Sequence, residues 1–137
     1  MDREDLLERV ARIFEKEPRL IHLSSRGKVV FVGDTHGDLD ATEQVMLRYL
    51  KKPYRIVFLG DYVDRGDQSE ENIDYLLHLK LEHSDDLFLL AGNHEGYMVK
   101  PHHPANFWDS LSIRERKAYG LLFSKFPLAA TSQNGIL

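Results

Sequence analysis

The stretch KVVFVGDTHG (residues 28–37) places a β-branched, apolar run directly before a glycine, an aspartate and a histidine. The same order recurs in YRIVFLGDYVDRG (54–66) and in DLFLLAGNHE (86–95). Each run has the composition of a buried strand, and apolar residues show helical spacing in 38–50 and 69–81. Because alternating strands and helices favour parallel βαβ units, the sequence predicts an α/β fold with a central, mainly parallel sheet flanked by helices. We expect 28–32 to be a central strand.

The segments outside this core also carry clear signals. Residues 2–17 show the apolar spacing of an amphipathic helix that Pro18 ends, so 1–25 is predicted to be an N-terminal helix and turn. Ser69 is a plausible N-cap of the next helix. Residues 111–126 read as another helix after a prolyl surface loop at 101–104, and 127–131 and 135–137 read as strands joined at Asn134-Gly135.

Composition limits the classes of protein that fit. The chain has 137 residues with 42% hydrophobic content, enough for one compact domain over 1–137. The net charge of -4 argues against a nucleic-acid binder. No apolar run approaches the roughly 18 to 20 residues of a membrane span. The absence of cysteine excludes thiolate chemistry, and we expect a cytoplasmic protein.

The polar residues after the three strands point to a metal site. The carboxyl ends of neighbouring parallel strands lead into one crevice, so side chains far apart in sequence meet there. Carboxylate, imidazole and amide ligands suit Mn, Fe or Zn. A single Gly-Asp pair would more often be a helix cap. Three such segments in this order favour metal binding.

These segments match the patterns GDxHG, GDxVDRG and GNHE, and with them the chain resembles the PPP-type serine/threonine protein phosphatases of the calcineurin-like metallophosphoesterase superfamily. The likeness extends to the helix before Pro18, to 70–80 and to 126–130. It implies the family's metallophosphatase fold. It also implies that this chain is the N-terminal half of the catalytic domain, truncated before the second half.

The resemblance assigns two divalent cations to the site. Asp34 and His36 would bind the first ion, Asp61 would bridge both ions, and Asn93 would bind the second. A carboxylate with two oxygens is suited to bridging. Only the first site would be complete in this chain, because the family takes further histidines for the second ion from the other half.

The same resemblance implies hydrolysis of phosphoserine or phosphothreonine on a phosphorylated protein by attack of a metal-bridging hydroxide. Arg65 and Asn93 would bind the substrate phosphate. His94 would protonate the leaving oxygen, a role that suits histidine because its pKa lies near neutral pH. Asp64 would orient His94, and Glu95 would anchor the loop.

Two other functions stay open at this stage. A symmetrical dinucleoside tetraphosphate hydrolase shares the three motifs, whereas the repair nucleases of the superfamily have only a looser version. The chain could instead be a non-catalytic half-domain that binds phosphate or metal. With half of the second metal site missing, we expect little or no activity from the chain alone, and we expect self-association through its C-terminal strand.

Overall fold

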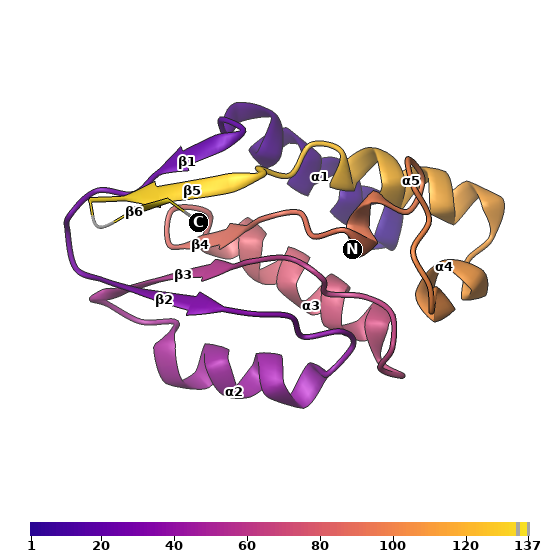
Figure 1. The fold of residues 1–137 in the computed structure, drawn as a ribbon, viewed down its shortest axis with the longest axis horizontal. Helices are drawn as coiled ribbons and strands as arrows, with labels where there is room; N and C mark the ends of the chain where they lie inside the picture. Colours follow the sequence, from indigo (N-terminus) through magenta and orange to yellow (C-terminus); the bar gives the residue numbers. More distant parts are fainter. Residues whose placement is uncertain (134, 137) are drawn as a thin grey trace.

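The computed structural model describes residues 1–133 and 135–136, and its six strands form two three-stranded sheets. One sheet has the order β1-β5-β6, and the other has the order β2-β3-β4. All strand pairs are parallel except β5 with β6. Figure 1 shows the two sheets one above the other. The strands are β1 (Leu20–His22), β2 (Lys28–Val32), β3 (Tyr54–Phe58), β4 (Leu87–Leu89), β5 (Ala129–Ser132) and β6 (Gly135–Ile136).

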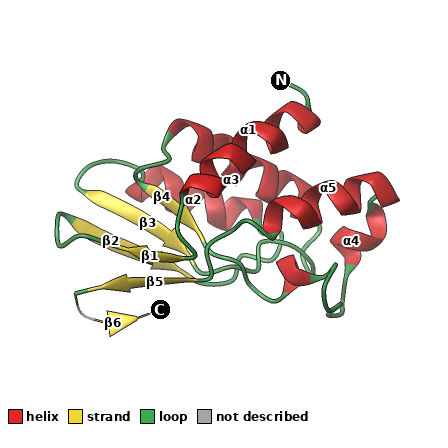
Figure 2. Ribbon diagram, turned by 90° about the horizontal axis from the view of Figure 1, so that it is seen from above, coloured by secondary structure: helices red, strands yellow, loops and turns green. Residues whose placement is uncertain are grey.

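Helices and strands alternate from β2 to β4, and the parallel strands are flanked by helices, which confirms the predicted α/β class. Figure 2 shows α1 and α3 gathered over the strands, with α4 and α5 beyond the strand ends. Asp2 caps α1 by accepting a hydrogen bond from Asp5 N–H, and Asp38 caps α2. The helices are α1 (Arg3–Lys16), α2 (Leu39–Tyr49), α3 (Ser69–Glu82), α4 (Asn106–Ser110) and α5 (Ile113–Phe123), with a 3₁₀ turn η1 (His94–Gly96).

Two features of the sheets differ from the sequence-based expectation. In the described part of the chain β3 is the central strand of its sheet, and β2, which was expected to be central, lies at the edge. The strand β1 was not predicted. It has only three residues, and its partner β5 comes from the opposite end of the sequence, so no local pattern reveals it. The expected turn at Asn134 and the chain end at Leu137 lie outside the described residues.

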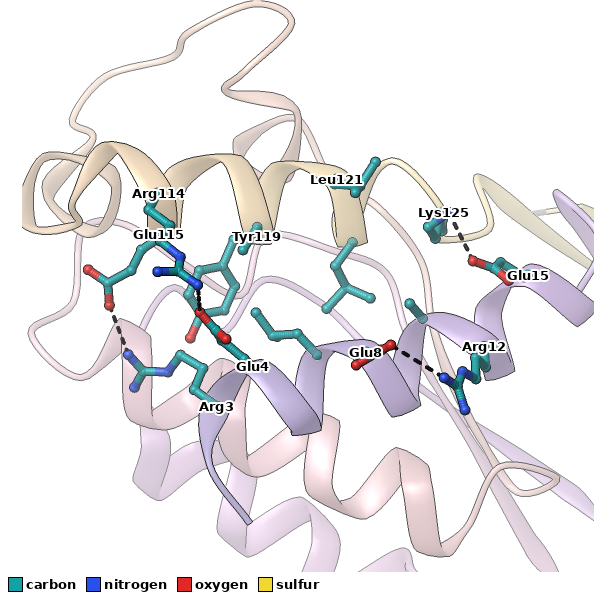
Figure 3. A pocket seen from close by; sticks show the side chains of 14 residues that line it. Arg3, Glu4, Glu8, Arg12, Glu15, Arg114, Glu115, Tyr119, Leu121 and Lys125 are labelled. Carbon is teal, nitrogen blue, oxygen red and sulfur yellow. Dashed lines mark hydrogen bonds and ion pairs between the residues drawn. The ribbon is translucent and has the colours of Figure 1, made fainter.

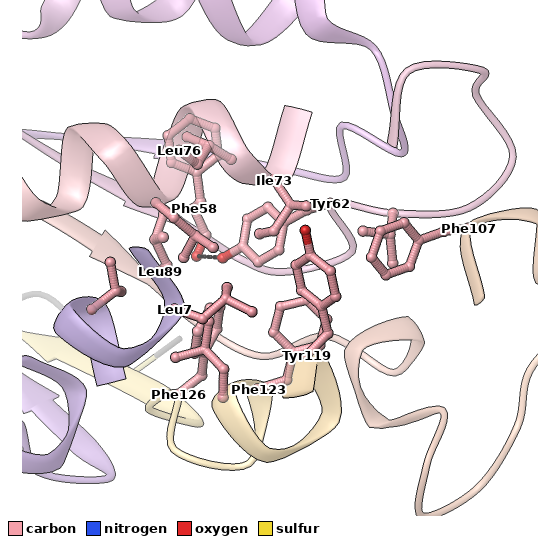
Figure 4. Packing of buried hydrophobic residues seen from close by; sticks show 14 of the residues in the cluster. Leu7, Phe58, Tyr62, Ile73, Leu76, Leu89, Phe107, Tyr119, Phe123 and Phe126 are labelled. Atoms are coloured by element: carbon pink, nitrogen blue, oxygen red, sulfur yellow. Dashed lines mark hydrogen bonds between the residues drawn. The ribbon is translucent and has the colours of Figure 1, made fainter. Parts of the chain in front are cut away.

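An aromatic core joins the helices to the sheet that carries the motifs. Tyr62 belongs to the second motif and is fully buried in this cluster, where its hydroxyl donates to the carbonyl oxygen of Leu90 at 2.6 Å. The ring also packs near Phe58 and Phe126 (Figure 4). The loop after β3 is therefore fixed to the core and to the end of β4 by one side chain.

A groove of about 610 Å³ lies between α1 and α5. Figure 3 shows its floor of apolar side chains and a rim of ion pairs, among them Arg114 with Glu4 and Lys125 with Glu15. None of the residues lining this groove belongs to the three motifs. The groove is thus separate from the strand-end site.

A buried ion pair fixes the end of α1 to α3. The Lys80 side chain is fully buried, and its Nζ lies 2.7 Å from Glu17 Oε2 and also donates to the carbonyl oxygens of Ser84 and Leu87. Burial lowers the pKa of Lys80, whereas Glu17 favours its charged form. The pair therefore matters because the fully buried Lys80 charge has no water to replace Glu17 as its partner.

We expect Glu17→Ala to lower the free energy of unfolding by about 3 kcal/mol, because it leaves the Lys80 charge buried without its partner. Urea unfolding measures the loss. The matched control is Glu15→Ala, which removes an exposed carboxylate from the solvent-accessible pair with Lys125 and should cost less than about 1 kcal/mol. Equal losses in the two variants would contradict the assignment.

Candidate active site

The three motifs meet at one edge because β2, β3 and β4 run parallel (Figure 1). Backbone hydrogen bonds join the first loop to the second: His36 N–H donates to the carbonyl oxygen of Asp61 at 2.9 Å, and Gly66 N–H donates to that of His36 at 2.9 Å. The loops are therefore held together by the main chain before any ligand binds.

Asp34, His36 and Asp61 form the cluster that can hold a cation. One potential ligand atom from each lies within 4.8 Å of the others. His36 Nδ1 lies 2.8 Å from the carbonyl oxygen of Val63, an acceptor, so Nδ1 carries the hydrogen and Nε2 presents its lone pair. In the described structure Nε2 is buried without a hydrogen-bond partner. An imidazole lone pair and two carboxylates fit a divalent metal ion.

Asn93 and His94 contact the same carboxylate of Asp61 from the third loop. His94 N–H donates to Asp61 Oδ1 at 2.9 Å. When its amide is turned so that nitrogen faces Asp61, Asn93 donates to Oδ2 at 2.8 Å. Asp61 therefore belongs to the cluster with Asp34 and His36 and also contacts Asn93 and His94 of the third loop.

Asp64 and His94 form a buried pair beside this cluster. Asp64 is fully buried and His94 is 3% exposed, and Asp64 Oδ2 lies 2.6 Å from His94 Nδ1. The second carboxylate oxygen, Oδ1, accepts from Phe107 N–H at 2.9 Å. The His94 ring lies edge-on to that of His36 at 5.0 Å between centroids. With Nδ1 directed at Asp64, Nε2 is the nitrogen left for proton transfer.

The backbone at these residues takes conformations that residues with side chains seldom adopt. Asp61, Asp64 and Arg65 have φ values of 59°, 72° and 72°. A Cβ on Gly92 would lie 2.3 Å from Asp61 Oδ1, so glycine is required where the third loop passes the second. Left-handed backbone in this setting is typical of sites where surrounding contacts hold a strained geometry.

Glu95 connects the second and third loops from beneath. Its carboxylate accepts hydrogen bonds from the N–H groups of Asp61 at 2.6 Å, Tyr62 at 3.0 Å and Gly92 at 2.8 Å. Burial raises the pKa of Glu95 to about 7, although the three N–H donors act in the opposite direction. Glu95 therefore anchors the loops, as expected from its position after His94.

Several residues around the site were not recognised from sequence. Ser69 is the first residue of α3, and its hydroxyl accepts from Asp64 N–H at 2.9 Å instead of capping its own helix. Asn72 is buried and donates to Thr35 Oγ1 and to the carbonyl oxygen of Tyr62, so it supports the first two loops. His102, in the loop predicted at 101–104, lies 6.1 Å from His94 between ring centroids.

The helix α4 supplies further support from a segment to which the sequence assigned no element, between the loop predicted at 101–104 and the helix predicted at 111–126. Asn106, Phe107 and Trp108 each make a hydrogen bond to the second or third motif. Polar side chains after a proline-rich stretch were the only sequence signal. That signal does not identify their partners, which lie 41, 43 and 14 positions earlier in the chain.

Comparison with known proteins gives the class of this chain. Residues 27–137 match the family described as calcineurin-like phosphoesterase, and the chain belongs to this family.

Its relatives include protein phosphatases. A protein of Encephalitozoon cuniculi named probable serine/threonine-protein phosphatase is 37% identical over 92 residues, covering 67% of this chain and 20% of its own length. Serine/threonine-protein phosphatase BSL2 of Arabidopsis thaliana is 31% identical over 97% of this chain and 14% of its own length. The chain therefore spans a fifth or less of these relatives.

Solved structures show the same fold. A Saccharomyces cerevisiae protein serine/threonine phosphatase with similarity to human phosphatase PP5 superposes with a TM-score of 0.81 at 24% identity, over 96% of this chain and 44% of that one. A cold-active protein-tyrosine phosphatase of a Shewanella species gives 0.65 at 20% identity, over 88% and 43%. Among the described residues no helix is long and apolar enough to cross a membrane.

Proposed function

We propose that this chain carries the strand-end site of a metal-dependent serine/threonine protein phosphatase. The observation that carries the proposal is the Asp64–His94 pair, at 2.6 Å, beside the cluster of Asp34, His36 and Asp61. A buried carboxylate that orients an imidazole next to a cation site is an arrangement that suits metal-assisted hydrolysis of phosphate esters.

Asp34 and His36 would hold one divalent cation, Asp61 would contact two, and Asn93 would contribute to the second. When bound, such ions acidify water and attract the charge that develops on the phosphoryl oxygens. The carboxylate of Asp61 can serve both sides because Asn93 and His94 approach it from one loop while His36 approaches from another. Asp61 and Asn93 are the two residues of this chain that we assign to the second ion, and we propose that turnover by the chain alone is slow.

Arg65 would bind the substrate phosphate. Its side chain is exposed, and its guanidinium makes no hydrogen bond or ion pair with residues 1–133 or 135–136. A planar guanidinium binds two phosphate oxygens through parallel hydrogen bonds. His94 Nε2 would give its proton to the leaving oxygen, while Asp64 holds Nδ1 and with it the orientation of the ring.

Phosphorylated serine and threonine side chains are the proposed substrates, because the two curated relatives are named serine/threonine-protein phosphatases. Their leaving groups are alkoxides, which need a proton donor. The His94–Asp64 pair meets that need.

Phosphate release tests the proposal. We expect Mn²⁺-loaded protein to release phosphate from a phosphothreonine peptide faster than it cleaves a symmetrical dinucleoside tetraphosphate, with no release after chelation. Faster tetraphosphate cleavage would favour the nucleotide hydrolase. Binding of Mn²⁺ without turnover of either substrate in long incubations would favour a non-catalytic module.

A further inference from the structure

The first residue of α4 is hydrogen-bonded to the backbone of the loop that presents Arg65. Asn106 Oδ1 accepts from Arg65 N–H at 2.7 Å, and Asn106 Nδ2 donates to the carbonyl oxygen of Gly66 at 2.9 Å. One side chain thus uses its acceptor and its donor on two consecutive residues of the second motif.

Asn106 does not serve its own helix. The N-cap of α4 is Ala105, no side chain caps this helix, and Asn106 is exposed. Both polar atoms of its amide instead make hydrogen bonds to residues 40 and 41 positions earlier in the chain. The hydrogen bonds of Asn106 therefore serve the loop at Arg65 and Gly66.

The loop needs this support because its backbone is strained. Asp64 and Arg65 are consecutive residues with φ of 72°, a conformation that side chains disfavour. The neighbouring N–H of Asp64 is held by Ser69 Oγ at 2.9 Å. Arg65 N–H has Asn106 as its partner. The backbone is also spanned at this point by Gly66 N–H, which donates to the carbonyl oxygen of Asp64 at 3.0 Å. Asn106 is the side chain that contacts the Arg65 backbone from α4.

The next two residues of α4 make hydrogen bonds to Asp64 and His94. Phe107 N–H donates to Asp64 Oδ1 at 2.9 Å, and Trp108 Nε1 donates to the carbonyl oxygen of His94 at 3.0 Å. The first turn of α4 therefore contacts Arg65, Asp64 and His94, each through a different group. Of these three residues of α4, Asn106 is exposed, whereas Phe107 and Trp108 are buried. Asn106 can therefore be substituted without disturbing the core.

We propose that Asn106 is a positioning residue for Arg65. It fixes the backbone from which the Arg65 side chain leaves, so that the loop itself does not have to become ordered when a phosphate group binds. The inference rests on the proposed function, because it assumes that Arg65 binds phosphate. A guanidinium that must form two parallel hydrogen bonds is sensitive to its direction, and small misplacements at a binding site are costly.

Binding of phenylphosphonate, a non-hydrolysable mimic of a phosphate ester, to the Mn²⁺-loaded protein tests this role in a double-mutant cycle. We expect Arg65→Ala to weaken binding by about 10-fold to 100-fold, as expected for the loss of charged hydrogen bonds. Asn106→Ala should weaken it by about tenfold. In the Arg65→Ala background the same change should add less than about twofold, because the two residues act as one unit.

Two measurements separate positioning from general damage. Mn²⁺ affinity and the melting temperature of Asn106→Ala should stay close to those of the unmodified protein. The matched control is Asp109→Ala, which changes an exposed residue of the same helix and should leave phenylphosphonate binding unchanged.

The outcomes distinguish the two proposals. Equal weakening by Asn106→Ala with and without Arg65, or no weakening at all, would overturn the positioning role while leaving the phosphatase proposal intact. If the unmodified protein binds Mn²⁺ but no phenylphosphonate, the proposed function fails and the role of Asn106 fails with it. Coupled losses at the two positions would establish the positioning role.

Discussion

Asp61→Asn is expected to abolish tight Mn²⁺ binding, with an affinity at least about 100-fold lower in calorimetric titration. Loss of an outer partner of a metal ligand alone costs 10-fold to 100-fold in affinity, so loss of a ligand charge should cost no less. Asp61 is one of only two carboxylates in the cluster, and it contacts both His94 N–H and the Asn93 amide. Asparagine keeps the shape and an acceptor for His94 but removes the negative charge.

Asp67→Asn is the matched control. Asp67 lies in the loop that follows the second motif, is exposed, and is not part of the carboxylate and histidine cluster. The same change of charge there should alter Mn²⁺ affinity by less than about threefold, because exposed charges are screened by salt.

Without metal, Asp61→Asn should melt no lower than the unmodified protein, since it relieves repulsion between Asp61 and Asp34. Equal losses of affinity in Asp61→Asn and Asp67→Asn would show that bulk charge, and not ligation by Asp61, governs binding.

The position of the candidate metal cluster could be predicted because it depends on the simplest property of the fold. Asp34, His36 and Asp61 directly follow strands with unmistakable apolar runs, and parallel strands bring their carboxyl ends to one edge. The parallel arrangement then largely fixes which of these residues become neighbours. The neighbouring β2 and β3 place His36 and Asp61 close enough for a backbone hydrogen bond.

The support of the site could not be predicted, because it depends on contacts that leave no periodic signal. Ser69 has the sequence position of a helix cap, yet its hydroxyl is used by Asp64 N–H, which the left-handed loop directs toward it. Asn106 follows a proline-rich segment that reads as irregular. Its partners Arg65 and Gly66 become visible only once the chain has folded back.

The same distinction explains the strands. Apart from Lys28 and Arg55, β2, β3 and β4 consist of apolar or aromatic residues, so these strands could be predicted. β1 is three residues long, and it becomes a strand only because β5 pairs with it. The prediction of β2 as the central strand was wrong for a related reason. Its run is β-branched and apolar, yet none of its residues is buried, because the order of strands depends on which crossover each helix makes and not on composition.

His94→Asn is expected to lower the turnover of a phosphoserine peptide by about 100-fold to 10,000-fold, the usual contribution of a positioned proton donor. Asparagine can still donate to Asp64 Oδ2, but it has no second nitrogen from which a proton can pass to the leaving oxygen. Mn²⁺ affinity should change little, because the contact of this residue with Asp61 is made by its backbone N–H. His103→Asn, at an exposed position of the loop before α4, is the matched control and should leave turnover unchanged.

The leaving group then separates proton donation from a general loss of geometry. A nitrophenolate departs without protonation, whereas a serine alkoxide does not, so His94→Asn should reduce hydrolysis of p-nitrophenyl phosphate far less than hydrolysis of the phosphoserine peptide. Asp64→Asn should show the same selectivity to a smaller extent, because it leaves His94 in place but weakens the 2.6 Å contact that orients the ring. Equal reduction for both substrates would mean that His94 binds phosphate and does not supply the proton, and the pair with Asp64 would then have to be assigned to substrate binding.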